Sequence, residues 1–132
     1  MGPKKSGYCC EFATYLGGGS ADGVNSGTSA VWVALRAPEI EPFTEVIVPP
    51  ISDQGSCIPV VLNKCIPVPV DCKPDLHNTG PEQVADAITE LSLASIVAHT
   101  AGYAVDIDPI VEMAHRRSMQ SIEDCAQAHE TR

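Results

Sequence analysis

Apolar residues lie along this chain in short runs separated by longer segments of mixed polarity. Four short runs predict strands, at 45–49, 66–71, 93–99 and 119–125, and the β-branched run at 45–49 is typical of a buried strand in a parallel sheet. The segments around them predict helices, at 8–16, 28–36, 55–65, 81–89 and from 108 onward. Strands that alternate with helices form βαβ units. The pattern therefore predicts an α/β fold, with a parallel sheet of about four strands flanked by helices.

Two prolines place the strand at 66–71 at an edge of that sheet. Pro67 and Pro69 lie two positions apart, so their nitrogen atoms face the same side of the strand. Neither nitrogen carries a hydrogen, and that side therefore cannot donate hydrogen bonds to a neighbouring strand.

The starts of the predicted helices carry recognisable signals. Ser26 or Thr28 can cap the helix at 28–36, which is apolar on nearly all sides and is therefore expected to be buried. The other signals are Pro59 in the first turn of 55–65, a capping box of Thr79 and Glu82, and Asp108 as a cap with Pro109 after it.

Composition narrows the class of protein. The 132 residues fit a single domain, taken as 1–132 with a flexible segment at 1–10, and the formal net charge of −9 argues against a nucleic-acid or anionic-membrane partner. The apolar runs are too short to span a bilayer, and no apolar leader segment follows Lys4 and Lys5. The six cysteines form no CxxC pair, which favours reduced thiols in a cytoplasmic protein.

Ligands of parallel sheets bind at the carboxyl ends of the strands, where three features of this sequence are expected to meet: the helix start at 26–29, the segment 124–127 and the loop at 49–55. The first is Gly27-Thr28-Ser29 at the start of a buried helix, where free N–H groups and hydroxyls could bind an anion. The alternative is that Ser26 and Thr28 only cap the helix.

The second feature is Asp124, which ends a predicted strand and is followed by Gln127. A carboxylate buried there needs a partner, and a protonated ring nitrogen would supply one. The alternative is a helix-capping aspartate. The four histidines lack metal-ligand spacing, His99 is interpreted as structural, and Cys125 has no evident base to activate its thiol.

The glycines at 17–19 resemble the phosphate loop of the small-metabolite kinases of the GHMP type. That family has a β-rich half before the loop, whereas only 15 residues precede Leu16 here. We therefore interpret the run as a coincidence, and a glycine-loop kinase is the weakest functional hypothesis.

A series of motifs resembles the sugar aminotransferases of the DegT/StrS type. In chain order they are Asn-Ser-Gly-Thr at 25–28, Val-Ile-Val-Pro at 46–49, Pro-Val-Pro-Val-Asp at 67–71, His-Thr-Ala-Gly at 99–102, Asp-Ile-Asp at 106–108 and Ile-Glu-Asp-Cys-Ala-Gln-Ala-His at 122–129. That family uses pyridoxal phosphate (PLP) on the fold-type-I scaffold, usually as a dimer. It moves an amino group from glutamate or glutamine to a keto sugar nucleotide.

The resemblance implies roles for several residues. Gly27, Thr28 and Ser29 would surround the cofactor phosphate, and Asp124 would pair with the pyridinium nitrogen. The remaining members of the implied set are Gln127 on the ring hydroxyl, His129 near the pocket, and Asp53 where the family commonly stacks an aromatic ring on the cofactor.

One departure from the family concerns catalysis. The Schiff-base lysine of the family lies well downstream of the Glu-Asp-x-Ala-Gln motif, and the lysines of this chain are Lys4, Lys5, Lys64 and Lys73. The sequence therefore predicts the N-terminal part of the large domain, inactive alone and with weakened PLP binding. The alternative is a non-catalytic α/β binding or interaction module.

The family's strand order also has a consequence for assembly. It places the strand with Pro67 and Pro69 at one edge of the sheet and the strand that ends at Asp124 at the other. An exposed apolar edge favours pairing, so we expect homodimers or other self-association. The segment 20–25 is polar and contains glycine, and is not expected to form a strand.

Overall fold

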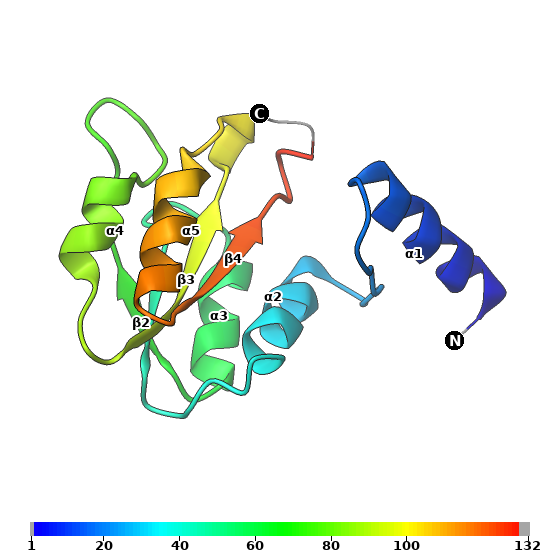
Figure 1. Ribbon diagram of the computed structural model, residues 1–132, viewed down its shortest axis with the longest axis horizontal. Coiled ribbons are helices and arrows are strands. Elements are labelled where there is room, and N and C mark those ends of the chain that lie inside the picture. Colours follow the sequence, from blue (N-terminus) through cyan, green and yellow to red (C-terminus); the bar gives the residue numbers. More distant parts are fainter. Residues whose placement is uncertain (1, 130–132) are drawn as a thin grey trace.

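The computed structural model describes residues 2–129 of the chain, and its centre is a parallel four-stranded sheet (Figure 1). The strands are β1 (Glu45–Val48), β2 (Ile66–Pro69), β3 (Ser92–Ala98) and β4 (Gln120–Asp124). Their order in the sheet is β2-β1-β3-β4, and each neighbouring pair is parallel. The predicted α/β class and parallel sheet are confirmed.

Helices cover both faces of the sheet. One face carries α2 (Gly27–Arg36) and α3 (Gln54–Leu62), and the other carries α4 (Pro81–Ala87) and α5 (Ile107–Arg116). The remaining helices are α1 (Pro3–Tyr15), beside this body in Figure 1, and the short 3₁₀ helix η1 (Thr100–Gly102). No helix among the described residues is long and apolar enough to cross a membrane.

Strand alternation divides the apolar side chains into two cores. Val46 and Val48 pack with Leu35 of α2, whereas Ile47 points to the opposite face and packs with Ile110 of α5. All five side chains are buried. The central strands are thus apolar on both faces, which explains the Val-Ile-Val run of β1 and the apolar run of β3.

The proline argument about the edge strand is confirmed. Ile66 and Val70, which flank the two prolines, turn their amides toward β1. The amide of Ile66 donates to Thr44 O at 2.8 Å, and that of Val70 donates to Val48 O at 3.2 Å. Pro67 and Pro69 present their nitrogen atoms to the other side, where the described residues contain no further strand. At the opposite edge of the described sheet lies β4.

The structure decides between the two predicted caps of α2 and corrects the expectation that this helix is buried. Its cap is Ser26, whose Oγ accepts a hydrogen bond from the Ser29 amide at 3.1 Å. The helix is also not buried on all sides, since Trp32 and Val33 are 40% and 43% exposed. A helix that rests on one face of a sheet turns only part of its circumference inward, whatever its composition.

The start signals of three other helices differ from the prediction, although α4 begins at Pro81 as expected. Asp53 caps α3 through the amide of Gly55, so the helix begins early enough to place Pro59 in its interior. The cap of α4 is Gly80, without the capping box, because the Thr79 side chain is buried and its hydroxyl has no partner among the described residues. The cap position of α5 is Asp106, which puts Asp108 in the first turn.

The N-terminal part differs from the prediction in extent. Helix α1 begins at Pro3, whereas the pattern predicted a start at residue 8. The flexibility of residues 1–10 and the single-domain assignment of 1–132 stay predictions. As expected, residues 20–25 form no strand.

Candidate functional site

A cavity of about 160 Å³ opens at the carboxyl ends of β1, β3 and β4, where parallel sheets bind ligands. Its wall includes Asp53, His99, Asp124 and Gln127. Three of the predicted site residues therefore meet in one place, and His99, interpreted from the sequence as structural, lies in the same wall.

Asp124 is the anchored carboxylate of this cavity. Its Oδ2 accepts a hydrogen bond from Ser56 Oγ at 3.2 Å, and its Oδ1 accepts one from the amide of Ala126 at 3.1 Å. The side chain is half-buried and lies at the end of the edge strand β4. Each carboxylate oxygen has two lone pairs, so Asp124 keeps capacity to accept a further donor from a ligand.

A second and wider cleft of about 640 Å³ shares Asp124 with the first. It also contains Gly27 and His129, and its floor includes Ala34 and Ile122. Five of the seven predicted site residues thus line two cavities that meet at Asp124, with Asp53 and Gln127 on one side and Gly27 and His129 on the other, whereas Thr28 and Ser29 line neither.

The start of α2 combines capping with exposed donors. Ser29 Oγ donates to Asn25 Oδ1 at 2.7 Å and accepts from Ser26 Oγ at 3.0 Å, so its hydroxyl is committed within the turn. The capping interpretation is therefore realised by Ser26. The amides of Gly27 and Thr28 belong to the first turn, whose N–H groups have no intrahelical acceptor and suit an anion.

The starts of α2 and α3 approach each other at Gly55. A Cβ atom at this position would lie 2.8 Å from Thr28 Oγ1 and 2.9 Å from Asp53 Oδ1, which leaves room only for glycine. Asp53 Oδ1 accepts from the Gly55 amide at 2.7 Å and so caps α3. The position where relatives were expected to stack an aromatic ring is therefore occupied here by a helix cap.

Gln127 holds the loop after β3 against the loop after β4. Its Oε1 accepts from the amide of Ala101 at 2.6 Å, which leaves the amide nitrogen to donate to a ligand. Ala101 has a positive φ of 58°, so this bond fixes a residue in a conformation that costs free energy.

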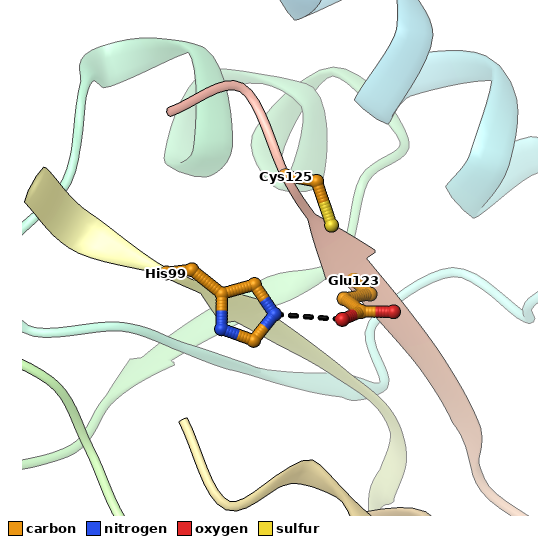
Figure 2. A group of neighbouring side chains, drawn as sticks. All are labelled: His99, Glu123 and Cys125. Carbon is orange, nitrogen blue, oxygen red and sulfur yellow. Dashed lines mark hydrogen bonds and ion pairs between the residues drawn. The ribbon is translucent and has the colours of Figure 1, made fainter. Parts of the chain in front are cut away.

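Both ring nitrogens of His99 are engaged, and Figure 2 shows the contact of one of them with Glu123. Nδ1 accepts from the amide of Val105 at 2.9 Å, and Nε2 lies 2.7 Å from Glu123 Oε1. An amide can only donate, so Nδ1 carries no proton and the neutral ring has its hydrogen on Nε2, which donates to Glu123. The side chain is 6% exposed.

His99, Glu123 and Cys125 form a cluster whose potential ligand atoms lie within 4.8 Å of one another. The hydrogen bonding argues against a metal there. The His99 lone pair is turned to Val105, and the nitrogen that faces Glu123 and Cys125 carries the hydrogen. A metal bound to Nε2 would move the ring hydrogen to Nδ1, and the hydrogen bond from the Val105 amide would be lost. We therefore interpret the cluster as a hydrogen-bonded link between the ends of β3 and β4.

The thiol of Cys125 is held in its protonated form. Burial and the neighbouring Glu123 and Asp124 carboxylates raise its pKa from the usual 9.0 to about 11. Both effects penalise the thiolate, which is the reactive form of cysteine. A nucleophilic role, for which the sequence offered no base, is therefore not supported at neutral pH.

The pH dependence of alkylation tests this assignment. The rate at Cys125, followed by iodoacetamide labelling and peptide mass spectrometry, is expected to keep rising up to about pH 11, because the thiolate forms only as that pKa is approached. Replacement Glu123→Gln removes one of the causes and should raise the rate at pH 8. A rate at Cys125 that levels off below about pH 9 would contradict the raised pKa.

Comparison with known proteins places this arrangement in a class. The four-stranded parallel sheet with helices on both faces matches part of the fold of fold-type-I aminotransferases. The family model "DegT/DnrJ/EryC1/StrS aminotransferase family" matches residues 1–132. The chain belongs to this family.

Individual relatives agree in sequence and structure. The chain is 39% identical over 132 residues to the dTDP-3-amino-3,4,6-trideoxy-alpha-D-glucose transaminase of Streptomyces venezuelae, covering all of this chain and 35% of the relative. The structure matches the aminotransferase from Psychrobacter cryohalolentis with a TM-score of 0.93 and 34% identity, over 98% of this chain and 33% of the other.

A third match is the PLP form of the sugar aminotransferase Spr1654 from Streptococcus pneumoniae. Its TM-score is 0.82 at 28% identity, and the match covers 91% of this chain and 31% of that one. The chain thus spans about a third of the length of the relatives that it matches.

Proposed function

We propose that this chain forms the PLP-binding part of an aminotransferase that acts on keto sugar nucleotides, with glutamate or glutamine as the amino donor. The observation that carries the proposal is the Asp124 carboxylate, fixed by two hydrogen bonds at the carboxyl end of β4 and open to both cavities. Bound PLP supplies an electron sink for chemistry at the amino carbon.

The ring end of the site fits this cofactor. A carboxylate held by Ser56 and by a backbone amide can pair with a protonated ring nitrogen, and a charge-assisted hydrogen bond of this kind fixes both the position and the protonation of the ring. The Gln127 amide nitrogen, whose oxygen is already bonded, can donate to the ring hydroxyl.

The phosphate end is supported by the start of α2. Its first amides, at Gly27 and Thr28, and the partial positive charge of the helix end favour an anion. The Ser29 hydroxyl would have to exchange its bond to Asn25 for one to the phosphate. His129, in the wall of the second cleft, is a further candidate near the cofactor.

A second candidate function is a non-catalytic binding module. It is favoured by the absence of a lysine among the described residues that line either cavity. For either candidate function, the sheet edge at β4 is a candidate surface for self-association. A cytoplasmic location stays a prediction.

PLP titration followed by absorbance and fluorescence tests the proposed function. Saturable binding is expected for the unaltered chain, and Asp124→Asn should weaken it by about thirtyfold because a hydrogen bond to a charged group is lost. The matched control is Asp86→Asn, which removes the same charge from an exposed position of α4. Equal affinities of the two variants, or no saturable binding by the unaltered chain, would overturn the proposal.

A further inference from the structure

Ser56 connects the start of α3 with Asp124. It is the third residue of that helix, and only 1% of its surface is exposed. Its hydroxyl lies 3.2 Å from Asp124 Oδ2 and 2.7 Å from Ser52 Oγ. The two partners stand on different segments, 68 and 4 positions away in the sequence.

The direction of these hydrogen bonds follows from counting protons. An ionised carboxylate can only accept, so Ser56 gives its single hydroxyl proton to Asp124. Ser56 must then accept at its other contact, which makes Ser52 the donor of the 2.7 Å bond. The result is a directed chain from Ser52 through Ser56 to Asp124, in which each bond polarises the next.

Ser56 does not line the cavity at the sheet edge, whereas Ser52 and Asp124 do. It therefore acts on a ligand only through the carboxylate. Its bond to Oδ2, together with the Ala126 amide on Oδ1, holds both oxygens and so sets the plane of the carboxylate. The positive end of α3, in whose first turn Ser56 lies, adds a favourable field for the negative charge.

We propose that Ser56 is a positioning residue for Asp124 and orients the carboxylate toward the ring nitrogen of the cofactor. Ser52 donates the hydrogen bond that holds the Ser56 hydroxyl in place. The inference rests on the proposed function for the identity of the ligand. The hydroxyl chain itself is a property of the protein without a ligand, so it can be measured separately.

The chain offers a matched control for a serine-to-alanine replacement. Ser95 of β3 is also 1% exposed, but its hydroxyl has no hydrogen-bond partner among the described residues. Both replacements remove one buried oxygen, and only Ser56→Ala frees the Asp124 carboxylate. Ser56→Thr keeps the hydroxyl and should restore the behaviour of the unaltered chain.

Two readouts decide the proposal. In the protein without PLP, the ¹³C carboxyl NMR signal of Asp124 is expected to shift in Ser56→Ala and to stay in place in Ser95→Ala. In PLP titrations, Ser56→Ala should weaken binding by about tenfold, because the freed carboxylate must then be immobilised when the ligand binds, and should change the pH profile of the bound-cofactor absorbance.

The outcomes separate this inference from the proposed function. An unmoved Asp124 signal in Ser56→Ala, or a PLP affinity equal to that of Ser95→Ala, overturns the positioning role even if the unaltered chain binds PLP. If the unaltered chain does not bind PLP but the Asp124 signal shifts as expected, the proposed function fails and the Ser56–Asp124 contact stands, while its aim at a cofactor is rejected.

Discussion

Replacement of His99 by alanine is expected to lower the free energy of unfolding by about 3 kcal/mol, from a lost buried hydrogen bond and a residual cavity. The ring accepts from the buried Val105 amide and donates to Glu123, and it is itself 6% exposed. Without the imidazole, the Val105 amide has no acceptor and no access to water. Urea unfolding followed by circular dichroism measures the change.

Two companion variants make the expectation specific. His115→Ala removes the same side chain from an exposed position of α5 and should change stability by less than about 0.5 kcal/mol. Glu123→Gln retains an oxygen that can accept from His99, and Glu123 is 48% exposed, so a small effect is expected. If His99→Ala lowers the free energy of unfolding no more than His115→Ala does, the hydrogen bonds of His99 do not stabilise the fold.

The sequence was informative where a property belongs to the residue itself. A proline lacks its N–H wherever it stands, so Pro67 and Pro69 predicted an edge strand and the register of β2 agrees. The Val-Ile-Val run at 46–48 likewise predicted a buried strand, and these residues of β1 are buried between β2 and β3. These arguments need no knowledge of what lies across the sheet.

Helix starts were predicted less well because several residues compete for the same N–H groups. Thr79 has the right type and spacing for a capping box, but its side chain is buried in the folded chain and Gly80 takes the cap position. Tertiary packing decides such competitions, and a local motif does not contain that information.

The candidate site was predicted only in part, again because tertiary packing brings some of its residues together. Asp124 and Gln127 were identified from the motif at the end of a strand, and the structure brings both into the cavity wall. The side-chain contacts around them were missed, because His99 contacts Glu123 from 24 positions away in the sequence and Ser56 contacts Asp124 from 68 positions away. Neither serine nor histidine carries a local signal of such a partner.

Incubation of this chain with PLP and borohydride is expected to leave the site without a covalent label, and transaminase turnover should be undetectable. Covalent catalysis requires an amine at the cofactor carbonyl, and neither cavity wall contains a lysine among the described residues. The sequence offers Lys4, Lys5, Lys64 and Lys73, of which Lys73 lines a separate cavity with Asp106. Peptide mass spectrometry after reduction locates any label.

The test depends on which lysines are labelled and to what extent, more than on whether any label is found. Surface lysines react slowly with any aldehyde, so substoichiometric labels spread over several lysines are expected, and they should be the same in Asp124→Asn because they do not depend on the site. A stoichiometric label on one lysine that disappears in Asp124→Asn, together with measurable amino transfer, would show that this chain assembles a catalytic amine. In that case the third of the family fold present here would be sufficient for the chemistry.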